Sequence, residues 1–248
     1  MDRICLMYHD VYEHDTNESG FQRERDFPYK LSSDQFEKQV KAINEYCQKT
    51  GVGKEHIVFT FDDGGKSFYT LIAPILEKYG YKGLFFVSTK YIGTDTFLNE
   101  NEIRDLYKKG HIIGSHAHTH LHLYTLTDEQ VRDEWKQSTS ILSEVIGAPV
   151  LYASIPNGDM SKRVLDAILD CGIKEVYTSE PTTKVAKFKG MEVIGRYVVL
   201  KDSSTDYVLS IISSKKTRFV LSCKRGLIKL VKGVLGSNYV KLKNKIYK

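Results

Sequence analysis

The chain has 248 residues, of which 41% are hydrophobic and 27% charged, and its formal net charge is +5. This composition excludes a disordered or collagen-like chain, and four widely spaced cysteines exclude a disulfide-stapled or zinc-knuckle domain. No run approaches the ~18 consecutive apolar residues that a membrane span needs. The apolar run at residues 4–8 is too short for a signal peptide, so we expect a soluble cytoplasmic chain with free thiols.

Short runs rich in Val, Ile, Phe and Tyr predict seven strands, separated for the most part by helical patterns. In chain order the strands are 3–8, 57–61, 82–87, 111–115, 150–154, 174–178 and 192–200, and the helices are 34–47, 66–79, 101–109, 128–146, 161–171 and 204–213. A polar loop that is suited to act as a lid follows the first strand, at residues 13–30. This alternation predicts a parallel sheet in a single α/β unit, either a closed (β/α) barrel or an open doubly wound sheet. No glycine-rich nucleotide-binding motif is present.

Polar clusters follow four of the predicted strands. They are His9-Asp10, Asp62-Asp63-Gly64, the run from His116 to His122, and Pro156-Asn157-Gly158. Since the carboxyl ends of parallel strands meet at one edge of a sheet, these clusters are expected to converge there. Such convergence is hard to explain by packing alone.

The composition of two of these clusters indicates a metal site. Adjacent carboxylates at Asp62 and Asp63 repel each other unless a cation or hydrogen bonds offset the repulsion. Histidines four residues apart share one face of a helical turn, a geometry that binds zinc. The pair at His116 and His120 has this spacing, and so does the pair at His118 and His122, so the residues alone leave both open. We infer a hydrolytic metal site from carboxylates and histidines.

The chain resembles the polysaccharide deacetylase family, also called NodB-homology or carbohydrate esterase 4. Residues 60–64 read T-F-D-D-G, the first motif of that family, and residues 110–116 with His120 match its second, G-H-x-I-G-S-H-[ST]-x-x-H, with Ala117 in place of Ser or Thr. Residues 6–9, L-M-Y-H, match the opening of many members. The resemblance covers residues 4 to about 213 and implies an irregular (β/α)7-type barrel that removes N- or O-linked acetyl groups from a polysaccharide or glycan precursor.

The same resemblance implies a division of roles. Asp62 is the base, while Asp63, His116 and His120 hold one divalent metal ion, whose bound water is the nucleophile. Zinc suits two histidines and a carboxylate, as do nickel, cobalt and iron. A backbone N–H of the third motif, at Pro156 and Asn157, meets the oxyanion.

Departures from the family pattern lead to two further predictions. The third motif, usually R-x-P-Y-G, reads S-I-P-N-G at residues 154–158, so Ser154 replaces the Arg that orients the catalytic Asp. We predict that Arg196, in the last strand, takes the place of that arginine. The alternative interpretation of Arg196 is a salt bridge at the edge of the core. No histidine follows His122, so the usual late histidine is missing, and His9 is our substitute for the general acid, against a structural histidine. These departures also support an alternative function, a degenerate, non-catalytic metal- and carbohydrate-binding barrel. A metal hydrolase acting on a non-sugar amide is a third.

The C-terminal segment differs from the rest of the chain in charge. Residues 215–248 hold eleven of the 36 basic residues and no acidic one, so residues 1–214 hold 25 basic and 31 acidic residues. We divide the chain into a barrel at 1–222 and a basic amphipathic tail at 223–248. Apolar residues at helical spacing, Leu227, Leu230, Val234 and Leu235, predict either contact of 224–248 with an anionic membrane, at its inner face, or packing on the barrel. No module indicates nucleic-acid binding.

Overall fold

The computed structural model describes residues 3–235, with side chains described to residue 228. Of the predicted apolar face, Leu230, Val234 and Leu235 therefore lie outside the described side chains, as do residues 236–248 of the tail. Among the described residues, no helix combines the length and the apolar character needed to cross a membrane. The cysteines are free thiols, as expected.

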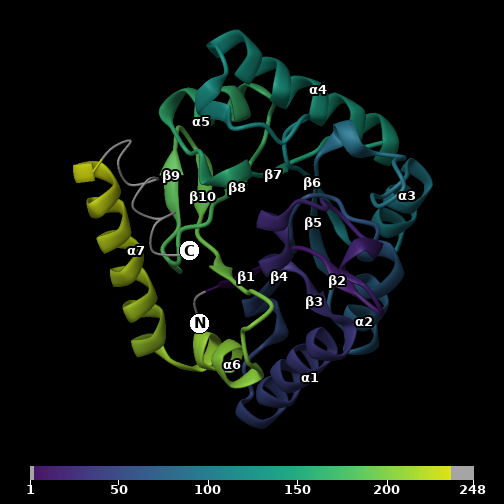
Figure 1. The fold of residues 1–248 in the computed structure, drawn as a ribbon, viewed down its shortest axis with the longest axis vertical. Coiled ribbons are helices and arrows are strands. Elements are labelled where there is room, and N and C mark those ends of the chain that lie inside the picture. The colour runs from purple at the N-terminus through teal and green to yellow at the C-terminus, as the bar shows by residue number, and fades with distance from the viewer. Residues whose placement is uncertain (1–2, 236–248) are drawn as a thin grey trace.

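A curled sheet of nine strands forms the centre of the molecule, with helices around its outside (Figure 1). In spatial order the strands are β11 (Tyr197–Val198), β1 (Ile4–Tyr8), β4 (Ile57–Phe61), β5 (Gly83–Val87), β6 (Ile112–Ser115), β7 (Tyr152–Ser154), β8 (Glu175–Tyr177), β10 (Met191–Ile194) and β9 (Ala186–Phe188). All neighbours pair in parallel except β9 and β10. The irregular (β/α) barrel predicted from the sequence is confirmed.

The last predicted strand, 192–200, is two strands in the structure. β10 pairs with β8 at one end of the curled sheet, and β11 pairs with β1 at the other. The chain between them therefore bridges the two ends, and Gly195 and Arg196 lie in this bridge. Glycine is required here because a Cβ at Gly195 would lie 2.3 Å from the carbonyl oxygen of Glu180. A single straight strand could not pair with both ends of the sheet.

Helices cover the outer face of the sheet and bury the main core. They are α1 (Ser33–Thr50), α2 (Ala73–Lys78), α3 (Glu100–Lys108), α4 (Asp128–Ile146), α5 (Lys162–Asp170), α6 (Thr205–Ser213) and α7 (Lys215–Leu235). A π-helical turn, Phe68–Ile72, precedes α2 and forms the first half of the helix predicted at 66–79. The predicted division between residues 222 and 223 falls inside α7, which runs along one flank of the molecule (Figure 1).

Strand pleating decides which side chains enter the barrel. In β1, Ile4, Leu6 and Tyr8 join the outer core under the helices, whereas Cys5 belongs to a small inner cluster. Alternate side chains of a strand point to opposite faces, so the inner series of β1 continues through Met7 towards His9 at the carboxyl end. The same alternation leads from β4 to the inward position of Asp62. The interior of the barrel is thus apolar around Cys5, and the polar clusters gather at the carboxyl ends of the strands.

The predicted loop at 13–30 is closed at its base and held from within. A second, two-stranded parallel sheet joins β2 (Val11–Tyr12) to β3 (Leu31–Ser32) on either side of it. The buried Lys30 donates from Nζ to the carbonyl oxygens of Thr16 and Ser19, each at 2.6 Å. The loop is therefore fastened to itself by Lys30, a residue that sequence reasoning had not singled out.

Candidate active site

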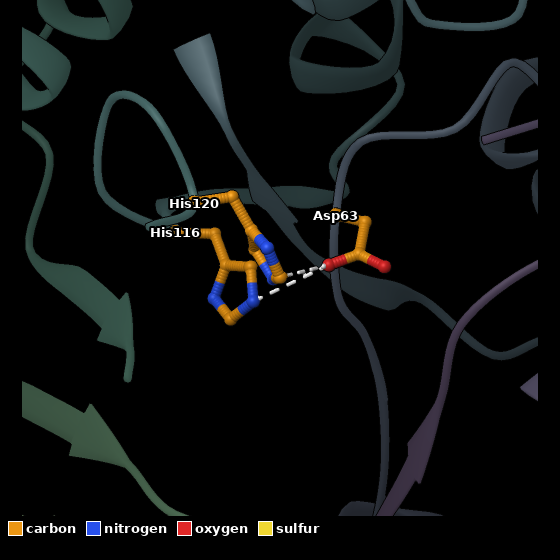
Figure 2. Close-up of side chains that lie close together, drawn as sticks. All are labelled: Asp63, His116 and His120. Carbon is orange, nitrogen blue, oxygen red and sulfur yellow. Dashed lines mark ion pairs between the residues drawn. The ribbon is translucent and has the colours of Figure 1, made fainter. Parts of the chain in front are cut away.

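Three candidate metal-ligand side chains meet at the carboxyl ends of β4 and β6. Asp63 follows β4, and His116 and His120 follow β6 (Figure 2). Asp63 Oδ1 lies 3.4 Å from His116 Nε2 and 3.1 Å from His120 Nε2, and the three ligand atoms lie within 4.8 Å of one another. His118 and His122 turn elsewhere, to Thr89 and Asp159 respectively. The structure thus assembles the first of the two possible histidine pairs.

The chemistry of these donors fits a divalent cation. His116 Nδ1 lies 2.9 Å from the carbonyl oxygen of Ser154, which can only accept, so Nδ1 carries the proton and Nε2 offers a lone pair towards Asp63. Asp63 Oδ1 and His120 Nδ1 are buried with no hydrogen-bond partner among the described residues. A buried carboxylate oxygen without a donor is costly unless a cation offsets its charge. Two imidazole nitrogens and one carboxylate form a donor set that suits zinc and its neighbours.

The two histidines approach each other through a bend rather than a helical turn, which corrects the geometry predicted from their spacing. Ala117 and His120 both have φ of 59°, in the left-handed region that side chains other than glycine rarely adopt. Glu134 of α4 holds this bend, because its carboxylate accepts the backbone N–H groups of His118 and Thr119 at 2.9 and 2.8 Å. Sequence reasoning missed Glu134, which lies in an ordinary amphipathic helix.

Backbone strain concentrates around this site. Asp63, Ala117, His120, Asn157 and Lys189 are the non-glycine residues with positive φ in the described part of the chain. All but Lys189 belong to the polar clusters at the strand ends. Such conformations cost about 1–3 kcal/mol each and persist where the surroundings hold them in place, commonly at functional sites.

Asp62 has a different environment from Asp63. Its carboxylate receives both arms of the Arg196 guanidinium, at 2.6 Å from Nη1 and 2.7 Å from Nη2, and the Ser154 hydroxyl donates to it at 3.2 Å. Arg196 is 1% exposed and Asp62 3%. Burial raises the pKa of Asp62, but the charges of Arg196, His116 and His9 and the hydrogen bonds from Arg196 together outweigh it and bring that pKa below its ordinary value. Asp62 is therefore an ionised carboxylate that is oriented by hydrogen bonds to Arg196 and Ser154.

Arg196 itself is fixed by three further contacts. Nη1 donates to the Thr60 hydroxyl at 3.1 Å, Nε to the carbonyl oxygen of Thr178 at 3.1 Å, and Nη2 to the Ser154 hydroxyl at 2.8 Å. The bridge between β10 and β11 brings this side chain across the barrel towards Asp62. Arg196 does form a salt bridge, as the alternative prediction held, but its partner Asp62 is buried in the polar cluster beside Asp63 and the two histidines.

His9 also borders the site. Its ring packs against Tyr29 with centroids 4.4 Å apart, and its Nδ1 is buried without a hydrogen-bond partner among the described residues. Burial lowers the pKa of His9, and the nearby carboxylates of Asp63 and Asp62 only partly oppose this effect. The imidazole is therefore mainly neutral near pH 7.

These groups line one cavity of about 670 Å³, a volume typical of small-molecule sites. Its wall includes the following residues of the predicted site: His9, Asp62, Asp63, His116, His120, Asn157 and Arg196. Pro156 of the third motif is buried, whereas Asn157 is exposed. Arg25, Asp26 and Tyr29 of the 13–30 loop also line the cavity, as do Tyr207 of α6 and Leu221 and Arg225 of α7. The position of the loop agrees with its predicted role as a lid, whereas sequence reasoning had not linked α7 to the site.

Comparisons with known proteins agree with this arrangement. A family model described as polysaccharide deacetylase matches residues 49–176. The peptidoglycan-N-acetylmuramic acid deacetylase PdaA of Bacillus subtilis is 31% identical over 147 residues, which are 56% of this chain and 54% of that protein. A peptidoglycan-N-acetylglucosamine deacetylase of Bacillus cereus is 27% identical over 155 residues, 62% of this chain and 70% of that protein. The chain spans about half the length of the first curated relatives it matches.

Solved structures share the fold. The Streptococcus pyogenes deacetylase PplD in complex with acetate superposes with a TM-score of 0.70 at 18% identity, over 86% of this chain and 99% of that one. IcaB from Ammonifex degensii gives a TM-score of 0.67 at 20% identity, over 86% and 97% of the two chains. At these identities the likeness concerns architecture alone. The family model, in contrast, spans half of the chain and includes both motifs that supply Asp62, Asp63, His116 and His120, and on that ground the chain belongs to the polysaccharide deacetylase family.

Proposed function

We propose that this protein is a metal-dependent hydrolase that removes acetyl groups from a glycan. One observation carries the proposal: two adjacent, buried aspartates have separate partners. Asp63 faces two histidines, and Asp62 faces an arginine. A protein that only bound a metal would gain nothing from a second buried carboxylate that is kept away from the ligands and held ionised.

Asp63, His116 and His120 would hold the cation. When bound, a divalent cation at this point would lower the pKa of water and polarise an acyl carbonyl. His116 is fixed for this task by its hydrogen bond to Ser154. We propose zinc as the metal because two imidazoles and a carboxylate are common zinc ligands.

Asp62 acts as the general base in this proposal. It is ionised, and its two oxygens are held in the guanidinium fork of Arg196. The fork lowers its basicity but fixes its direction, and it stabilises the anionic form that accepts a proton from the attacking water. Arg196 thus acts as a positioning residue. The backbone of Asn157, turned into the left-handed region, would contribute its N–H to the developing oxyanion.

His9 is our proposal for the group that protonates the leaving nitrogen. It borders the same cavity, and its pKa is lowered by burial, so a protonated imidazole is scarce in the resting site. It must therefore gain its proton during the reaction, and the proton that Asp62 takes from water is the nearest source.

The substrate class follows from the relatives. Their names specify N-acetylmuramic acid and N-acetylglucosamine in peptidoglycan, and this supports an N-acetylated amino sugar for the present chain.

Acetate release tests the proposal. The zinc-loaded full chain is incubated with N-acetylglucosamine oligomers, peptidoglycan and O-acetylated xylan. We expect release from at least one N-acetylated substrate, and a loss of about 10²-fold or more in Asp62→Asn with the metal retained. If no substrate released acetate although the protein held the metal and bound N-acetylglucosamine oligomers, the result would instead favour the non-catalytic binding barrel.

A further inference from the structure

Over the side chains that the structure describes, residues 215–228, helix α7 contacts the rest of the molecule along one face. Arg218 Nη1 donates to the carbonyl oxygens of Ile211 and Ile212 at 2.7 and 2.9 Å, at the end of α6. Leu221 packs against the core, and Arg225 pairs with Glu180 through Nε and Nη2 at 3.2 and 3.1 Å. Residues 218, 221 and 225 follow helical spacing, so they define the inner face of α7.

The opposite face of α7 is apolar and exposed. Phe219 is 69% exposed, Leu227 65% and Val220 42%, and Cys223 is exposed between them. At 3.6 residues per turn these four lie within about 100° of the helix circumference, centred opposite Leu221. We call this set the outer stripe. Isolated exposed apolar residues are common, but four on one face of one helix form a patch of the kind that marks an interaction surface.

Lysines border the outer stripe. Lys215 lies towards one edge and Lys224 towards the other, both exposed, and the exposed Lys216 lies within the stripe. No acidic residue occurs from 215 to the end of the sequence. In the sequence, Leu230 and Val234 continue the same apolar spacing. An apolar stripe with basic borders is complementary to a surface of anionic headgroups over hydrocarbon. A second copy of this helix would oppose it with like charges.

We propose that the outer stripe of α7 docks on an anionic lipid membrane. The docking stands on the helix alone. Its consequence for substrate rests on the proposed function: Leu221 and Arg225, on the inner face, line the catalytic cavity. The cavity then lies within about one helix diameter, ~10 Å, of the lipid surface. A glycan held at the membrane would be within its reach.

Vesicle sedimentation tests the docking without reference to activity. The full-length protein is mixed with vesicles of equal phosphatidylcholine and phosphatidylglycerol, or of phosphatidylcholine alone, at 0.1 M and 1 M salt. Phe219→Ser with Leu227→Ser removes most of the outer stripe. The border variant combines Lys215→Glu, Lys216→Glu and Lys224→Glu, and it reverses the charge of the two lysines at the edges of the stripe and of the one within it. The matched control reverses three exposed lysines on other helices, Lys49, Lys108 and Lys136.

We expect the wild type to bind anionic vesicles at 0.1 M salt, with binding reduced on neutral vesicles and at 1 M, because the Debye length falls from ~10 to ~3 Å. The border variant should lose about 100-fold in partitioning, the stripe variant at least 10-fold, and the control less than 10-fold. Equal losses in the border variant and its control would overturn the proposal, since net charge alone would explain them. The proposal would also be overturned if the wild type formed a dimer and did not bind vesicles, and if the stripe variant, Phe219→Ser with Leu227→Ser, dissociated that dimer. Acetate release by each variant in solution is recorded separately, so that loss of docking is distinguished from loss of the proposed activity.

Discussion

Removal of Arg196 should destabilise the fold through the charge it leaves behind. In Arg196→Met the carboxylate of Asp62 remains at 3% exposure and loses both guanidinium contacts, at 2.6 and 2.7 Å. Breaking a buried ion pair by deleting one partner costs about 3–5 kcal/mol of unfolding free energy. Replacing both partners costs less, because no charge is left unpaired. We therefore expect Arg196→Met with Asp62→Asn to be more stable than Arg196→Met alone.

The pH dependence of stability tests the same coupling independently, because the direction of the effect can be predicted. In the wild type the folded-state pKa of Asp62 is depressed, so its contribution to stability is present above the unfolded pKa and is lost as pH falls. Without Arg196, burial is opposed only by the weaker charges of His116 and His9, and the pKa of Asp62 rises. The variant should therefore be destabilised more at pH 8 than at pH 5.

Urea unfolding measures both effects in the wild type, Arg196→Met, Asp62→Asn and the double variant. A chelator is present to exclude metal. Arg196→Lys serves as the matched control because it keeps the charge but cannot form the two parallel hydrogen bonds. Additive losses for the two single substitutions, or a cost of Arg196→Met that does not depend on pH, would refute the coupling between Asp62 and Arg196.

Three further outcomes are expected. His120→Ala should abolish stoichiometric zinc binding, measured by metal analysis after dialysis, and retention of one equivalent would contradict the assigned ligands. His9→Gln should keep the metal and lose about 10²–10⁴-fold in kcat/KM if His9 protonates the leaving group, whereas a loss of a few-fold would place the acid elsewhere. Burial raises the pKa of Asp10 to about 6 from 3.8, so the folded protein binds the proton more tightly and this group lowers stability as pH rises from 4 to 6. Asp10→Asn should remove up to about 3 kcal/mol of this decline in the free energy of unfolding, measured with urea at several pH values. If the free energy of unfolding of the variant had the same pH dependence as that of the wild type, the raised pKa would be contradicted.

Local signals in the sequence were sufficient for most elements. Thr127 opens α4 with a capping box to Gln130, and Gly147 ends the helix in the left-handed conformation at φ 69°. Both features depend only on residues within a few positions, so they can be read without knowing the fold. The choice between a closed barrel and an open doubly wound sheet required more, and the resemblance to a known family supplied it.

Features that depend on distant partners could not be read in this way. The run at 192–200 has the composition of one strand, yet its halves pair with β8 and β1. The bend at 117–120 contains no residue that demands positive φ, and Glu134, which holds it, lies in α4. Likewise, the apolar spacing of the C-terminal segment was clear in the sequence, but the direction in which that face points was not. Contacts of Arg218 and Arg225 fix the orientation of α7.

The change from Arg to Ser in the third motif shows why a motif departure can mislead. At position 154 the sequence lacks the expected arginine, which supported a loss of function. In the structure Ser154 is fully buried between the two charged groups, donating to Asp62 and accepting from Arg196 Nη2 at 2.8 Å. An arginine at 154 would compete with Arg196 for this space. In the proposed mechanism the base needs a guanidinium at a point in space rather than at a position in the chain, and Arg196 provides one beside Asp62. On that proposal the missing arginine does not argue for a non-catalytic barrel.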